Sequence, residues 1–129
     1  MTQAPRTHLA IDPRLCGEPV SLEDGRAVTR FVATPEMAAD DRGLVHGSFV
    51  FGLADYAAML AVNDPFVVLG SADVRFTAPV RVGEEVIATA TRVEHKGKKH
   101  VIEVSASAGD RKVLEGKLTA FVLDEHVLD

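Results

Sequence analysis

Cysteine is nearly absent from this 129-residue chain, and basic side chains are in the minority. The single Cys16 cannot form an internal disulfide, and no Cys-x-x-Cys pair or histidine-rich cluster indicates zinc. We therefore expect no metal and a reducing, cytoplasmic location. Nineteen acidic residues against 14 basic ones give a net charge of −5. This balance lacks the basic surface that attracts nucleic acid or an anionic membrane, and neither is an expected partner.

Long apolar segments and internal divisions are also lacking. Residues 1–10 contain no apolar stretch of signal-peptide length, and Asp55 interrupts the longest apolar region, so we expect neither a leader nor a membrane span. No repeat, low-complexity tract or Gly/Ser-rich linker divides the chain. Length and composition predict an irregular N-terminal arm at 1–17 and a single domain at 18–129.

One segment, 46–63, is apolar on nearly every face. Its length, its alanines and its Met and Leu favour a helix over a strand, and Asn63-Asp64-Pro65 follows as a stop signal. A helix without a polar face must be buried on all sides.

Extended segments dominate the rest of the chain. Residues 18–34 form a predicted hairpin around Glu23-Asp24-Gly25, and four further strands are expected at 66–77, 84–95, 99–108 and 112–124. Short turns between successive long strands predict antiparallel pairing of sequence neighbours. The expected fold class is α+β, with a curved antiparallel sheet wrapped around one long central helix.

Asp55 is the only charged side chain between Gly47 and Val62. Burying an unpaired carboxylate costs several kcal/mol, so this position needs an explanation. One hypothesis is a general base or nucleophile in an apolar cleft. The alternative is a structural acid, placed at a subunit seam or satisfied by backbone donors.

The segment that opens the helix, His46-Gly47-Ser48, is a second candidate. Unpaired N–H groups at a helix start bind anions or an oxyanion, and Gly47 would let a carbonyl approach closely. The alternative is an ordinary turn with His46 or Ser48 as the N-cap. His46 and Asp55 are nine residues apart, which is roughly 13 Å along one helix, too far for both to act on one carbonyl. If both are catalytic, they come from two subunits of a dimer.

The stretches HGSFVFGLAD at 46–55 and RFTAPVRVGE at 75–84 resemble the hotdog-fold acyl-CoA thioesterases of the phenylacetate-pathway (PaaI) type. The resemblance implies hydrolysis of a small or medium acyl- or aroyl-CoA, with Asp55 as base or nucleophile and the N–H of Gly47 holding the oxyanion. His46 would position the loop. It also implies a site at a homodimer interface, and such dimers often pair into a homotetramer. Coenzyme A would be part of the substrate, with no further cofactor.

The chain departs from the family pattern at two places. Ser48 replaces the second glycine of His-Gly-Gly, and Asp40 stands where many members have an asparagine six residues before the histidine. A second carboxylate near Asp55 would raise the pKa of one of them. Some members carry a Ser or Thr on the strand after the helix, and the matching position here is Ser71 or Leu69. Ser48, Asp40 and Ser71 are expected to contact the substrate.

A basic cluster, His95-Lys96-Gly97-Lys98-Lys99-His100, stands out in this acidic chain. Lys96, Lys98 and Lys99 are candidates for binding the phosphates of coenzyme A, with a solvated hairpin turn as the alternative. Arg75, Arg81 and Arg92 are further candidates for the same role. Two other functions compete with the thioesterase: a non-catalytic acyl-CoA-binding module that senses or sequesters its ligand, and an assembly subunit.

Overall fold

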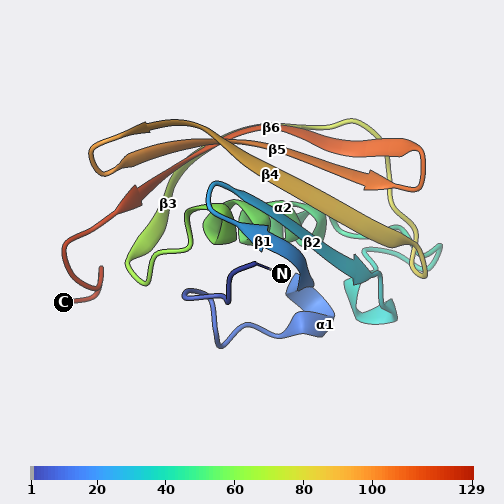
Figure 1. Ribbon diagram of the computed structural model, residues 1–129. Coiled ribbons are helices and arrows are strands. Elements are labelled where there is room, and N and C mark those ends of the chain that lie inside the picture. The colour runs from blue at the N-terminus through green and yellow to red at the C-terminus, as the bar shows by residue number, and fades with distance from the viewer. Residues whose placement is uncertain (1) are drawn as a thin grey trace.

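The computed structural model describes residues 2–129 and places one long helix against a curved six-stranded sheet (Figure 1). The predicted helix and strands are all present, with ends displaced by no more than two residues. In chain order the elements are α1 (Pro13–Cys16), β1 (Glu18–Glu23), β2 (Arg26–Val32), the 3-10 turn η1 (Pro35–Met37), α2 (Gly47–Val62), β3 (Val67–Phe76), β4 (Glu85–Lys96), β5 (Lys99–Ala108) and β6 (Arg111–Val122). The α+β hotdog architecture is confirmed.

The strands follow the order β1-β2-β4-β5-β6-β3, and each neighbouring pair is antiparallel. The expected hairpins β4–β5 and β5–β6 are present. The expected pairing of 66–77 with 84–95 is wrong, because β3 pairs with β6 at one edge of the sheet and β4 pairs with β2. The chain between β3 and β4 does not close a hairpin. Its Val80 carbonyl accepts a hydrogen bond from Val45 N–H, and Arg81 bridges to Leu44.

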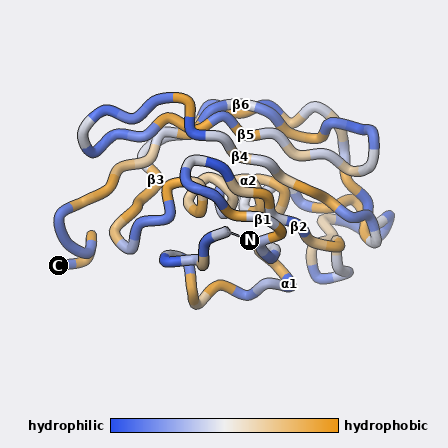
Figure 2. The backbone as a smooth tube through the Cα atoms, in the orientation of Figure 1, coloured by the Kyte–Doolittle hydropathy of each residue, from blue (hydrophilic) through white to orange (hydrophobic). Residues whose placement is uncertain are grey.

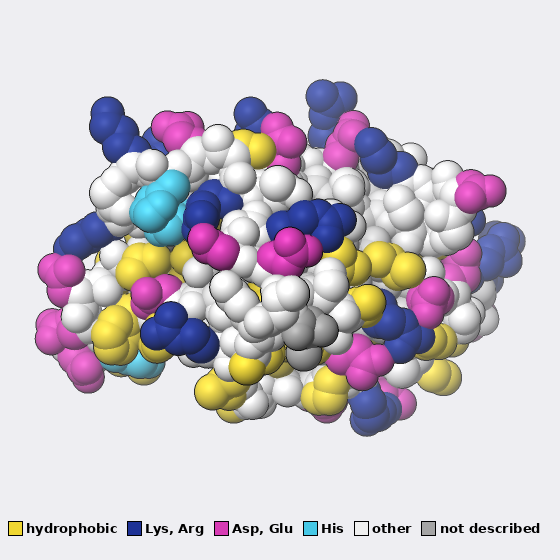
Figure 3. Space-filling view, viewed as in Figure 1, with side chains coloured by type: hydrophobic (Ala, Val, Ile, Leu, Met, Phe, Trp, Pro, Cys, Tyr) yellow, Lys and Arg dark blue, Asp and Glu magenta, His cyan; other side chains and the backbone are white. Residues whose placement is uncertain are grey.

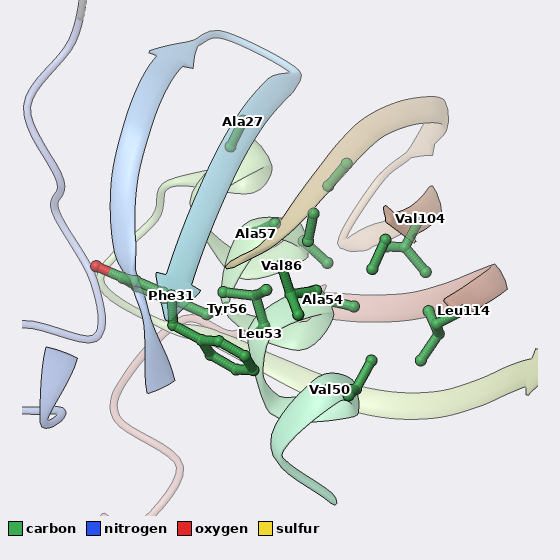
Figure 4. Packing of buried hydrophobic residues seen from close by; sticks show 14 of the residues in the cluster. Ala27, Phe31, Val50, Leu53, Ala54, Tyr56, Ala57, Val86, Val104 and Leu114 are labelled. Atoms are coloured by element: carbon green, nitrogen blue, oxygen red, sulfur yellow. The ribbon is translucent and has the colours of Figure 1, made fainter. Parts of the chain in front are cut away.

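The core lies between α2 and the concave face of the sheet. Val86, Ala88 and Ala90 on β4 are fully buried, whereas Ile87 between them is 40% exposed, as the alternation of a strand requires. Figure 4 shows residues of α2, including Val50, packed among side chains of β2, β4, β5 and β6. In Figure 2 blue, hydrophilic stretches lie in the loops and along parts of the strands, whereas the chain of α2 is mostly pale to orange. Small side chains on the strands let the sheet approach the helix closely.

The N-terminal arm covers the side of α2 that faces away from the sheet (Figure 1). Asn63 ends the helix in the left-handed conformation, with φ of 54°. Its Oδ1 accepts from Arg6 N–H at 2.7 Å, and its Nδ2 donates to Ala4 O at 3.1 Å. The ring centroid of Tyr56, a residue of α2, lies 6.1 Å from that of His8 in the arm. The division into an arm at 1–17 and a domain at 18–129 stays a prediction.

Within residues 2–129, no helix has both the length and the apolar character needed to cross a bilayer.

Candidate functional site

Backbone contacts with two neighbouring loops fix the point at which α2 begins. His46 N–H donates to Met37 O at 2.9 Å, and Val45 N–H donates to Val80 O at 2.9 Å. Both bonds lie directly before the first helical residue, Gly47. The helix start is therefore held by elements distant in sequence.

The first turn of α2 has no side-chain cap. His46 occupies the N-cap position, but its exposed ring makes no capping hydrogen bond and packs edge-on against Phe49. Within residues 2–129, no hydrogen-bond acceptor meets the N–H groups of Gly47 and Ser48. The interpretation of His46 or Ser48 as a side-chain cap finds no support in these contacts. Two backbone donors point outward at the positive end of the helix dipole.

Asp55 lies two turns further along α2 and is partly buried. Its Oδ1 is closed off from solvent, and no donor among residues 2–129 reaches it. Burial raises the pKa of Asp55 from 3.8 to about 6. Backbone donors do not satisfy this oxygen, so the carboxylate is more basic than a solvated aspartate and is ionised at neutral pH.

Ser48, Gly52 and Asp55 share one face of α2, because residues three and four apart are neighbours on a helix. A Cβ placed on Gly52 would meet nothing within 4 Å, and Ser48 is exposed. The expectation that this helix is buried on all sides is therefore wrong for a single chain. The sheet and the arm cover most of α2, but within the described residues they leave Ser48 exposed and Gly52 and Asp55 only partly covered.

An apolar hollow adjoins the helix start. The residues that line it come from the start of α2 and the residue before the helix, from the end of β3 and the chain after it, and from β6: Val45, Gly47, Val50, Phe76, Thr77, Ala78, Pro79, Val80 and Val113. Phe76 is 54% exposed, and a Cβ on Gly47 would lie 3.4 Å from its ring. The ring of Phe76 thus packs beside the two free N–H groups, at a distance at which a Cβ on residue 47 would be in van der Waals contact with it.

Asp40 lies in the exposed loop before α2, where its side chain has a local role. Its Oδ1 accepts from Arg42 N–H at 2.9 Å and from Leu44 N–H at 3.1 Å. Burial raises the pKa of Asp55, and no second carboxylate contributes to this shift. Within one chain the carboxylate of Asp40 therefore shapes the loop, and its contact with substrate stays a prediction.

Ser71 is exposed on β3, directly after an irregularity in the register with β6 between Leu69 and Ser71. Gly70 lies at this irregularity, under the ring of Phe121. Because β3 is an edge strand of the sheet, Ser71 lies where a second chain could approach.

Lys96, Lys98 and Lys99 occupy the exposed turn between β4 and β5. Figure 3 shows dark-blue basic side chains and a cyan histidine over the left end of the molecule, where this turn lies. The hollow beside it is lined by residues that include Val62, the last residue of α2. Gly47 is the first residue of the same 16-residue helix, so a length of roughly 24 Å separates the two ends. One chain does not bring the lysines to the helix start.

Three arginines, Arg42, Arg81 and Arg111, line a hollow beside the helix start. Arg81 was a candidate from the sequence, whereas Arg42 and Arg111 were not. The three arginines come from three separate segments of the chain. No spacing in the sequence indicates that the fold brings them together.

Comparisons with known proteins place the chain in a family. Residues 63–126 match the family model described as fluoroacetyl-CoA-specific thioesterase (FlK). The uncharacterized protein PH1136 from Pyrococcus horikoshii superposes with a TM-score of 0.96 at 50% identity, covering 98% of each chain. The phenylacetic acid degradation protein PaaI from Thermus thermophilus, solved as a mutant, has a TM-score of 0.77 at 27% identity, covering 84% of this chain and 95% of PaaI.

These likenesses show the hotdog fold and a resemblance to PaaI-type thioesterases, as the sequence motifs predicted. The chain belongs to the same family as the Pyrococcus protein.

Two curated relatives are longer than this chain. It is 49% identical over 120 residues to methylthioribose-1-phosphate isomerase of Aquifex aeolicus, covering 92% of this chain and 26% of that protein. It is 28% identical over 113 residues to the transcription factor FapR of Thermoanaerobacter sp., covering 87% of this chain and 56% of FapR. The chain thus spans between about a quarter and a little over half of these relatives.

Proposed function

We propose that this protein is a thioesterase that hydrolyses a small or medium acyl- or aroyl-CoA by carboxylate-assisted attack of water. The observation that carries the proposal is Asp55, a partly buried carboxylate whose Oδ1 has no donor among residues 2–129, in an otherwise apolar helix of a PaaI-like fold. The match to a thioesterase family model supports the same reaction class.

In the proposed reaction Asp55 accepts a proton from water as the water oxygen attacks the thioester carbonyl. Alternatively, Asp55 attacks the carbonyl itself, and water then hydrolyses the resulting anhydride. The negative charge that develops on the carbonyl oxygen is held by the free N–H of Gly47 at the helix start. The carbon–sulfur bond breaks, and protonation of the thiolate releases coenzyme A and a carboxylic acid. The groups used are the chain's own and water, and we propose no further cofactor.

The two groups in this scheme cannot come from one helix. Gly47 and Asp55 are eight residues apart, which is about 12 Å along α2. We therefore propose a homodimer, in which one protomer supplies Gly47 and its partner supplies Asp55. The open edge of β3 and the open face of α2 around Gly52 offer a place for the second chain. Two such dimers would form a homotetramer.

We also propose a cytoplasmic location, because a chain with a single cysteine and no internal disulfide fits a reducing compartment.

The test is steady-state release of coenzyme A thiol from short, medium, branched and aromatic acyl-CoAs, with Asp55→Ala measured in parallel. We expect turnover by the unaltered protein on at least one ester, and a loss of at least about a hundredfold in kcat for the variant. Binding of the same ester should survive the substitution. Comparable turnover by both proteins would contradict the role given to Asp55.

A second candidate function is a non-catalytic module that binds acyl-CoA. The likeness to FapR favours it, because that relative is named for transcription and not for catalysis. Under this alternative no ester in the panel is hydrolysed although a CoA ester binds. An assembly role would instead leave both binding and turnover absent, and Asp55→Ala would change the oligomeric state.

A further inference from the structure

The hollow beside the start of α2 differs from the other hollows near the helix because three arginines line it. Its walls come from the loop before α2, the segment between β3 and β4, and the start of β6: Asp40, Arg42, Leu44, Pro79, Arg81, Glu84 and Arg111. Three of the seven side chains are guanidinium groups, which suit phosphate oxygens because of their fork geometry.

Internal contacts already use both carboxylates of this hollow. Glu84 accepts from two sources, Arg111 Nη2 at 2.8 Å and Arg81 N–H at 2.7 Å, which lowers the pKa of Glu84. Asp40 accepts from the backbone N–H groups of its own loop.

Two cations of the hollow remain uncommitted. Within the chain from residue 2 to residue 129, the guanidinium groups of Arg42 and Arg81 form no ion pair. Both residues are exposed, so a ligand can reach them. The hollow therefore offers two guanidinium groups without an ion pair, beside one carboxylate, Glu84, that is paired with Arg111 and another, Asp40, that is held by backbone N–H groups.

This hollow also adjoins the apolar one at the helix start. Pro79 lines both. The bridge between Leu44 and Arg81 and the bond from Val45 N–H to Val80 O hold the two loops side by side. The pair of hollows suits a ligand that is apolar in one part and phosphorylated in another.

We propose that Arg42 and Arg81 bind the phosphate groups at the nucleotide end of acyl-CoA. The inference rests on the proposed function for its choice of ligand. It assigns this role to the loops around the start of α2 and not to the lysines of the β4–β5 turn. At that turn Lys98 already pairs with Asp124 at 2.8 Å, and Asp64 lines the same hollow.

The kinetic test compares a matched pair of substrates: one acyl-CoA, and the same acyl group on pantetheine, which has no phosphate. In the double variant Arg42→Ala/Arg81→Ala we expect KM for the CoA ester to rise about tenfold or more, since each charge-assisted bond is worth about a factor of ten. KM for the pantetheine ester should stay within about twofold. An equal change for both substrates would overturn the proposal.

The comparison variant is Lys96→Ala/Lys98→Ala/Lys99→Ala, which removes more positive charge from the other end of the molecule. We expect it to raise KM for the CoA ester much less than the arginine pair does. If the lysine variant weakens the CoA ester and the arginine variant does not, the phosphates bind at the β4–β5 turn and the proposal fails.

A binding measurement separates this inference from the proposed reaction. Calorimetry with coenzyme A and with adenosine 3′,5′-bisphosphate should show affinity that falls with added salt and falls further in the arginine variant. Arginine-dependent binding without turnover of any ester would refute the thioesterase and support the phosphate site. Turnover, together with coenzyme A binding that the arginine variant does not weaken, would support the thioesterase and refute the phosphate site. Absence of binding by either probe would also refute the phosphate site.

Discussion

Asp55 shows how one residue takes its chemistry from its surroundings. A solvated aspartate is a weak base, but this carboxylate lies in an apolar helix where desolvation penalises its charged form and raises its pKa to about 6. The same burial that makes it a better base also makes it costly to ionise. Activity and stability should therefore respond to pH in opposite directions at this residue.

If Asp55 acts as the base, only its ionised form is active. We expect kcat/KM for a hydrolysed acyl-CoA to increase with pH, with a midpoint near 6, and to level off above about 7. The measurement is a pH–rate profile from about pH 4.5 to 8. A midpoint near 4, or a flat profile, would show that the carboxylate is not desolvated in the working enzyme.

The stability prediction has the opposite sign. Because the pKa of Asp55 is higher in the folded state than in the unfolded chain, the folded state binds the extra proton between about pH 4 and 6. The free energy of unfolding should fall over this interval as the pH rises, by an amount on the order of 3 kcal/mol. Asp55→Asn removes the charge, so it should be more stable than the unaltered protein at pH 7 and nearly equal at pH 4.

Denaturant unfolding at the two pH values measures this difference. The matched control is Asp41→Asn, which removes an exposed carboxylate from the loop before α2 and should change stability by less than about 0.5 kcal/mol. Equal stability of Asp55→Asn and the unaltered protein at pH 7 would contradict a desolvated carboxylate.

At the scale of elements, strand β3 depends on one close approach to β6. A Cβ on Gly116 would lie 2.1 Å from Asp73 O and 2.7 Å from Val74 Cα, and both are backbone atoms that cannot move aside cheaply. Gly116→Ala should therefore destabilise the protein by about 3 kcal/mol or more and loosen β3 first. Urea unfolding gives the total effect, and amide hydrogen exchange should report faster exchange along β3.

A glycine in open space is the control for this substitution. Gly109 has φ of +60° in the β5–β6 turn, and a Cβ there would meet nothing within 4 Å. Gly109→Ala should cost only about 1 kcal/mol, the conformational penalty of a left-handed residue. A similar cost for both substitutions would indicate that β3 shifts to relieve the contact.

The elements themselves were largely readable from the sequence. The segment 46–63 was long, rich in alanine and stopped by Asn63-Asp64-Pro65, and the helix runs from Gly47 to Val62. The partner of each strand was harder to predict from the sequence. The short segment at 79–83 looked like a hairpin turn, but its backbone bonds go to the loop before α2, which no local pattern reveals.

At the scale of the whole molecule, the open face of α2 makes a testable claim about assembly. If a second chain packs on this face, Gly52→Lys places a charge in the interface. We expect sedimentation to give at least twice the 13.8 kDa of one chain for the unaltered protein, and a shift to the monomer with loss of activity for Gly52→Lys. Asp110→Lys, in an exposed turn, is the control and should leave the mass unchanged. An active monomer would contradict a site shared between protomers.

The helix, the strands, the hotdog resemblance and the choice of Asp55 as a candidate all followed from the order of the amino acids. Each of these rests on local periodicity, on a contiguous motif or on one charge in an apolar segment. Three features required the folded chain: β3 lies at the sheet edge, one face of α2 stays open, and Arg42, Arg81 and Arg111 share a hollow at the end of α2 opposite the lysines. These features depend on contacts between segments far apart in the chain, and such contacts leave no periodic trace in the sequence.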